Sequence, residues 1–116
     1  MADVDKWDVR FYRLAQEVAN WSKDPTAKVG ALLVSPDGRR VSMGYNGFPR
    51  GVADLQCRLE DKHCKNALMA HAERNALDNC ADDPAGWTLY VTRFPCLSKG
   101  CALGIIQRGI ARVVAD

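Results

Sequence analysis

Three short segments of the sequence carry the side chains best suited to chemistry. One reads His71-Ala72-Glu73; the others hold Cys96, directly after a proline, and Cys101, with four residues between the two cysteines. One imidazole and two thiolates form a three-ligand set for Zn²⁺ that leaves the fourth tetrahedral position to water, which is the catalytic pattern. Bound zinc lowers the pKa of its water to about 7, and a nearby carboxylate can move the released proton. The pattern predicts a hydrolytic zinc site with Glu73 as the proton carrier.

These segments fall where two helices are expected to begin, one over residues 70–80 and the other over 97–108. The peptide N–H groups at a helix start favour negative charge, and this environment lowers the pKa of a thiol. Residues two apart do not share a face of a regular helix. His71 and Glu73 can therefore converge only where the helix is just beginning, or by approaching the water from different sides.

The remaining elements must position these helix starts. Apolar residues spaced by three and four predict a helix over residues 5–22 that packs into the core through Trp7, Phe11, Leu14, Val18 and Trp21. Residues 28–34 and 41–45 read as a hairpin around Pro36-Asp37-Gly38. Residues 87–92 and 110–115 read as strands, and they alternate with helices, which favours parallel pairing. We expect one α/β domain over residues 1–116, with helices on both faces of a mixed sheet.

Composition and charge exclude several classes of protein. Hydrophobic residues make up 47% and charged residues 26% of the 116, so the chain is globular and neither disordered nor a coiled coil. No apolar run reaches the roughly 18 residues of a membrane-spanning helix, and no secretory signal is recognisable. The net charge of +2 does not call for a nucleic-acid partner. Five cysteines without a signal point to a reducing, cytoplasmic setting.

The sequence resembles the deoxycytidylate deaminase family of the cytidine deaminase superfamily. The zinc-deaminase signature is H-x-E followed by P-C-x-x-C. The resemblance is carried by six segments: SKDP (22–25), KVGA (28–31), GYNGFPRG (44–51), HAERNA (71–76), FPC (94–96) and IIQRGI (105–110). It implies a three-layer α-β-α fold. Two departures stand out: the family has two residues between its cysteines where this chain has four, and its fold continues to a fifth strand and a further helix beyond the point where this sequence ends.

The resemblance also implies an activity, which is the deamination of dCMP to dUMP and ammonia by one zinc ion per chain. The ion would be held by His71, Cys96 and Cys101, with Glu73 as the catalytic residue. The implied substrate-binding residues are Ser22, Lys23, Thr26, Asn46 and Ala72. The loop that binds regulatory dCTP or dTTP in the family corresponds here to Tyr45, Gly47, Arg50 and Gly51. Such a triphosphate would bring Mg²⁺, and family members form homo-oligomers, for which we expect a hexamer here.

The sequence alone leaves three alternative interpretations open. Cys57, His63 and Cys64 suggest a second zinc site, but the surrounding segment resembles the family branch with a single zinc, and Cys80 is expected in the core. The same chemistry could act on a base in tRNA or single-stranded DNA, which the near-neutral charge and the GYNG loop disfavour. A non-catalytic zinc-binding domain would need no Glu73 and would favour a fourth protein ligand.

Overall fold

In a computed structural model of the protein, residues 5–47, 71–93 and 101–115 can be described, and these residues carry one mixed β-sheet. Strands β1 (Gly30–Val34) and β2 (Val41–Tyr45) form an antiparallel hairpin. Strand β3 (Thr88–Val91) pairs antiparallel with β1, and β4 (Arg112–Ala115) pairs parallel with β3. The order across the sheet is β2-β1-β3-β4. The predicted hairpin and the predicted parallel pair are both confirmed.

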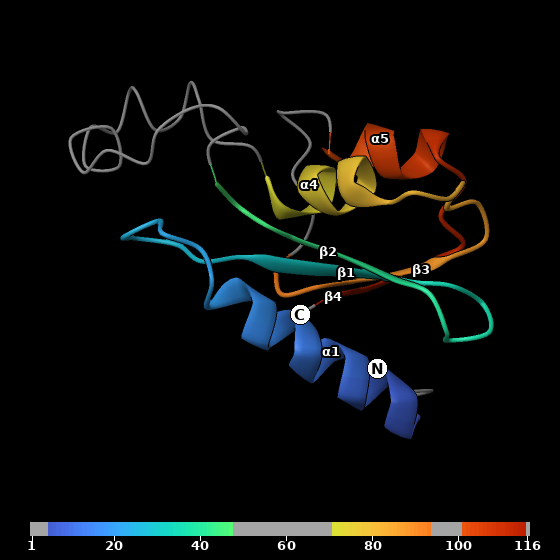
Figure 1. Ribbon diagram of the computed structural model, residues 1–116, viewed down its shortest axis with the longest axis horizontal. Helices are drawn as coiled ribbons and strands as arrows, with labels where there is room; N and C mark the ends of the chain where they lie inside the picture. The colour runs from blue at the N-terminus through green and yellow to red at the C-terminus, as the bar shows by residue number, and fades with distance from the viewer. Residues whose placement is uncertain (1–4, 48–70, 94–100, 116) are drawn as a thin grey trace.

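Helices cover both faces of this sheet, as the sequence predicts (Figure 1). Helix α1 (Lys6–Ala19) lies on one face, where Ala15 packs with Leu32 and Val114 in a buried cluster. Helices α4 (Ala72–Asn79) and α5 (Cys101–Gln107) lie together on the other face. A second cluster there joins both helices to the sheet through Ala31, Leu33, Ala72, Ala76, Leu77, Leu89, Val91 and Ile105.

Two glycines let the helices approach the strands closely. A methyl group at Gly44 in β2 would overlap the backbone of α4 at Ala72 and Ala76. A methyl group at Gly30 in β1 would overlap the backbone of α1 at Ala15 and Ala19. Because any side chain at these positions would push a helix off the sheet, glycine here fixes the depth at which α1 and α4 are seated.

Helix α1 differs from its prediction in length and in the face it buries. It ends at Ala19, and Trp21 and Ser22 continue it only as turns that donate to the carbonyls three residues back. Within the predicted apolar stripe Val18 is fully buried, whereas Trp7, Leu14 and Trp21 are 40–51% exposed. Small residues occupy the core-facing positions because the close approach at Gly30 leaves no room for large side chains between this helix and the sheet. The prediction that Trp7, Leu14 and Trp21 form core was therefore wrong.

The other helices follow their predictions more closely. Helix α4 begins one residue after His71 and ends before Cys80, whose thiol is partly buried against the second cluster. Helix α5 ends at Gln107, and Gly109 takes a positive φ of 74°, as expected of a residue that ends a helix. None of the helices in the described ranges is both long and apolar enough to span a membrane.

Candidate active site

The starts of α4 and α5 lie at the same end of the sheet. Each helix leads into a strand, α4 into β3 and α5 into β4, and these two strands are parallel. Because both helices run back along the same face before their strands begin, both start near the carboxyl end of β3 (Figure 1). His71 at the start of α4 and Cys101 at the start of α5 are therefore brought to the same end of the sheet.

The backbone at the start of α4 explains how His71 and Glu73 can converge although residues two apart do not share a face of a regular helix. His71 is the N-cap of α4 and has an extended backbone, with φ −77° and ψ 155°. It lies outside the helix, so its side chain does not follow the helical spacing of 100° per residue. Glu73 is in the first turn and is 3% exposed. A carboxylate in the first turn of a helix can exchange protons with a ligand that reaches it.

The predicted ligands agree with zinc in their chemistry. Imidazole nitrogen and thiolate sulfur are the donors that zinc prefers. The His71 side chain does not cap its helix. Cys101 is the first residue of α5, whereas Cys96 lies outside the described residues, as do Cys57, His63 and Cys64. Among the side chains that are described, no three His, Cys, Asp or Glu residues gather into a metal site.

Three side-chain hydrogen bonds hold α4 against β2. The Asn75 amide donates to the Tyr45 carbonyl at 2.7 Å, and the Asn79 amide donates to the Met43 carbonyl at 3.0 Å. In the opposite direction, the Ser42 hydroxyl donates to the Ala76 carbonyl at 2.7 Å. Together with the close contact at Gly44, these bonds fix the start of α4, and with it His71 and Glu73, relative to the end of β2.

The loop between α1 and β1, residues 22–29, is tied to Asn46 at the end of β2. The Asn46 side chain is buried, and its amide donates to the Ala27 carbonyl at 2.9 Å and to the Asp24 carboxylate at 3.3 Å. Its carbonyl oxygen accepts from the Val29 N–H at 2.9 Å. The Ser22 hydroxyl donates to the Asn46 main-chain carbonyl at 2.8 Å. Both amide hydrogens of Asn46 are thus used, and its side-chain oxygen keeps one further accepting position.

The structure brings all five predicted substrate residues to this end of the sheet. Ser22 and Asn46 are buried in the loop network, Ala72 is the first residue of α4, and Thr26 and Lys23 are exposed on the loop. Their contacts with a nucleotide stay a prediction. Of the predicted regulatory residues, Tyr45 and Gly47 flank Asn46, whereas Arg50 and Gly51 lie outside the described residues. The Tyr45 ring meets Trp21 edge to face, with ring centroids 6.2 Å apart.

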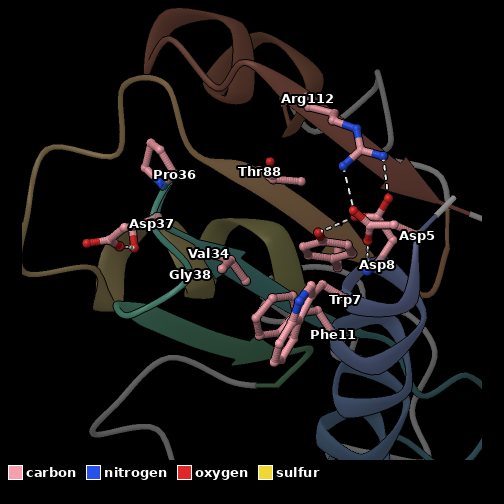
Figure 2. Close-up of a pocket in the computed structure, with 12 residues that line it drawn as sticks. Asp5, Trp7, Asp8, Phe11, Val34, Pro36, Asp37, Gly38, Thr88 and Arg112 are labelled. Carbon is pink, nitrogen blue, oxygen red and sulfur yellow. Dashed lines mark hydrogen bonds and ion pairs between the residues drawn. The ribbon is translucent and has the colours of Figure 1, made fainter. Parts of the chain in front are cut away.

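A second polar cluster lies at the opposite end of the sheet, beside a cavity of about 350 Å³ (Figure 2). The Arg112 guanidinium donates one hydrogen bond to each oxygen of the Asp8 carboxylate, at 2.8 and 2.5 Å. The Tyr90 hydroxyl donates a further hydrogen bond to Asp8 at 2.6 Å. The Arg112 hydrogen bonds hold the pKa of Asp8 at about 2, against the opposing effect of burial. Burial and the bond to Asp8 raise the pKa of Tyr90. Since every group is paired, this cluster ties α1 to β3 and β4.

The roles of two buried aspartates, Asp24 and Asp8, were not predicted from the sequence. Asp24 stands in the sequence only as part of the SKDP segment, yet it is 5% exposed and accepts hydrogen bonds from its own loop and from Asn46. Asp8 lies on the buried face of α1 together with Ala15, Val18 and Ala19, and its partner Arg112 is 104 residues away. The signal that could have indicated these buried carboxylates was an aspartate on an otherwise apolar helix face or inside a tight loop.

Comparison with known proteins identifies the family. Residues 5–116 match the family model described as the cytidine and deoxycytidylate deaminase zinc-binding region. The chain belongs to this family, as the resemblance implied. It is 41% identical over 110 residues to the protein named uncharacterized deaminase in luxG 3′ region of Aliivibrio fischeri, covering 95% of this chain and 72% of that one.

Two further relatives carry a named substrate. The human deoxycytidylate deaminase is 36% identical over 121 residues, which cover 97% of this chain and 65% of the human protein. The crystal structure of the dCMP deaminase of cyanophage S-TIM5 in complex with dCMP and dUMP superposes with a TM-score of 0.83 at 29% identity. That match covers 97% of this chain and 82% of the phage chain. The predicted fold class is confirmed. The chain spans slightly less than two thirds of the length of the human relative.

Proposed function

We propose that this protein hydrolyses the exocyclic amino group of dCMP, giving dUMP and ammonia. The observation that carries the proposal is the placement of Glu73, which is buried in the first turn of α4, next to His71 at the N-cap. Membership of the deaminase family and the likeness to the phage enzyme with dCMP and dUMP support the choice of reaction and substrate.

One zinc ion per chain would be held by His71, Cys96 and Cys101. When bound, zinc supplies Lewis acidity, which makes water a competent nucleophile near neutral pH. The family's zinc-binding region spans these residues, and the shared position of the α4 and α5 starts supports the set. Two thiolates and an imidazole leave a fourth position open, as a catalytic zinc site requires.

Glu73 would carry the protons of the reaction. Its carboxylate takes a proton from the attacking water and gives it to N3 of the cytosine ring. It then moves the second proton of that water to the departing amino group, which leaves as ammonia. The reaction consumes one water for each dCMP and releases one dUMP and one ammonia. Burial suits this role because it excludes bulk water that would compete for the proton.

The loop over residues 22–29 and Asn46 would bind the sugar and phosphate, and the backbone of Ala72 would face the pyrimidine. The N–H of Ala72, at the first position of α4, has no partner within the helix, so it suits a ring acceptor. Ser22, Lys23 and Thr26 would lie near the phosphate. Asn46 can serve only through its side-chain oxygen, which accepts a hydrogen bond from a ligand donor such as a sugar hydroxyl.

Regulation and assembly complete the proposal. Residues 1–116 would form one deaminase domain of a cytoplasmic homo-hexamer, in which dCTP with Mg²⁺ and dTTP act in opposite directions. Tyr45, Gly47, Arg50 and Gly51 would bind the effector. Support comes from the position of Tyr45 and Gly47 beside Asn46, and from large apolar side chains exposed on several elements, among them Trp21, Met43, Leu103 and Ile106. An effector can shift an equilibrium only through its preference for one state.

A substrate comparison tests the proposed function. Ammonia release is measured with zinc-loaded protein on dCMP, CMP, deoxycytidine and an adenosine-containing tRNA at equal concentrations. We expect dCMP to be the preferred substrate in kcat/KM. Preference for the tRNA would assign the chain to nucleic-acid deamination, and the absence of ammonia from all four would support a non-catalytic zinc-binding domain.

A further inference from the structure

Asp24 organises the loop that approaches the candidate site, and its carboxylate collects donors from two segments of the chain. One oxygen accepts from the Thr26 N–H at 2.9 Å, from the Thr26 hydroxyl at 3.0 Å and from the Ala27 N–H at 3.2 Å. The other oxygen accepts from the Asn46 amide at 3.3 Å. The carboxylate thus sets the shape of the loop with one oxygen and ties it to the end of β2 with the other.

This loop is connected to the start of α4 by a short chain of hydrogen bonds. Asn46 follows Tyr45, whose carbonyl accepts from the Asn75 amide at 2.7 Å. Asn75 in turn donates its backbone N–H to the His71 carbonyl at 3.0 Å. On the other side of the loop, the Gly30 N–H donates to the Thr92 hydroxyl at 3.1 Å, just beyond the end of β3. The position of the loop is therefore defined relative to the start of α4 and to the end of β3.

Asp24 itself does not occupy a ligand-facing position. It is 5% exposed, whereas Thr26 and Lys23 on either side of it are exposed. A buried carboxylate that orients exposed polar neighbours acts on a ligand through those neighbours. Holding such groups in place before the ligand arrives favours affinity, because groups that are already ordered lose less conformational freedom on binding.

We propose that Asp24 is a positioning residue, which sets the affinity for the sugar-phosphate part of the substrate by holding Thr26 and Asn46 in place. The inference rests on the proposed function. It separates the site into two parts: His71 and Glu73 carry the chemistry, and the Asp24 network carries nucleotide affinity. Loss of the network should weaken substrate binding and leave the chemical step nearly intact.

Asp24→Asn is the sharpest variant, because it keeps the size of the side chain and removes one acceptor. An amide at position 24 must point its NH₂ group either at the Asn46 amide or at the Thr26 and Ala27 N–H groups, so donor faces donor in both orientations. Asp8→Asn is the matched control: Asp8 is equally buried and hydrogen-bonded, but it lies at the opposite end of the sheet.

Steady-state kinetics with dCMP, zinc content and thermal unfolding are measured for the wild type and both variants. We expect Asp24→Asn to raise KM for dCMP by about tenfold or more with kcat within about threefold and zinc unchanged, and to weaken binding of dUMP equally. Asp8→Asn should lower the melting temperature without changing KM.

An unchanged KM in Asp24→Asn, or an equal rise in KM in Asp8→Asn, would overturn the positioning role. If Asp24→Asn does not fold, Asp24→Glu takes its place, since it keeps the charge and moves the acceptors by one methylene, and the same rise in KM is expected. A wild-type protein that binds zinc but leaves dCMP unchanged would contradict the proposed function instead, so the two failures are distinguishable.

Discussion

At the scale of single residues, the account depends on a carboxylate and an imidazole whose backbones differ. His71 has an extended conformation at the N-cap, and Glu73 lies in the first helical turn. The two side chains can therefore face one site although they are only two residues apart. The spacing of the signature predicts that they act together, and the cap geometry explains how they could do so.

Replacing Glu73 by glutamine should abolish deamination while fold and zinc are retained. The amide cannot accept and return a proton, and a general acid–base group typically contributes about 10²–10⁴-fold. Because Glu73 would serve several proton transfers, we expect a loss at the top of this range or beyond. The check is kcat with dCMP at measured zinc occupancy, with Glu17→Gln on the exposed face of α1 as the matched control. Turnover within tenfold of wild type would contradict the assigned role.

At the scale of elements, the depth of α4 against β2 decides where the site lies. Asn75, Asn79 and Ser42 bridge the two elements, and Gly44 lets their backbones touch. Gly30 in β1 allows the same close backbone contact with helix α1. In both places a small residue on the strand, rather than a large one on the helix, sets the packing.

Gly44→Ala should destabilise the protein by about 1–3 kcal/mol, the usual cost of overpacking a core. The added methyl group meets backbone atoms of α4, which cannot rotate away. Urea unfolding measures the change, and kcat/KM should fall with it because His71 and Glu73 move. Gly104→Ala in α5 is the control: among the described residues, its methyl group would meet the Leu77 side chain alone, at an ordinary contact distance of 3.9 Å. A neutral or stabilising effect is expected there, and an equal loss in both variants would refute the packing argument.

The elements were predictable from the sequence to different degrees. The hairpin and the strands at 88–91 and 112–115 follow from short apolar runs bounded by turn residues, and these were recovered. The buried face of α1 could not be predicted. Periodicity marks Trp7, Leu14 and Trp21 as apolar, but it does not show that the close approach at Gly30 excludes large side chains from the contact between α1 and β1. The Asp24–Asn46 and Asp8–Arg112 contacts join residues distant in sequence, so no local pattern reveals them.

At the scale of the whole molecule, Asp8 and Arg112 join the first helix to the last strand. Asp8 has its pKa lowered from 3.8 to about 2 by Arg112, so the ionised carboxylate stabilises the folded state. This contribution is fully present above pH 4 and is lost as the pH falls from about 4 to 2.

Acid unfolding of Asp8→Asn tests this linkage. We expect the wild type to exceed the variant in free energy of unfolding by about 1–2 kcal/mol at pH 7, with the partial exposure of Arg112 limiting the value. The difference should shrink as the pH falls towards 2. Urea unfolding between pH 2 and 7 measures it, and a difference that does not change with pH would exclude Asp8 as its source.

Assembly and regulation give a further prediction at this scale. We expect sedimentation to show a hexamer, and dCMP saturation curves to shift in opposite directions with dCTP and dTTP. An effector bound at Tyr45 and Gly47 would lie next to Asn46, which holds the loop over residues 22–29, so it could bias that loop through differential binding. A monomer with hyperbolic kinetics that ignores both nucleotides would show that the chain has the chemistry without the regulation.

The central claim is that this chain deaminates dCMP hydrolytically at the site around His71 and Glu73. The most direct measurement incubates the zinc-loaded protein with dCMP in water enriched in oxygen-18 and follows dUMP by mass spectrometry together with released ammonia. The account predicts equal amounts of dUMP and ammonia, with one solvent oxygen in each dUMP base and negligible product from Glu73→Gln. A folded, zinc-containing wild type that leaves dCMP unchanged, or a Glu73→Gln variant that forms dUMP at the wild-type rate, would contradict it.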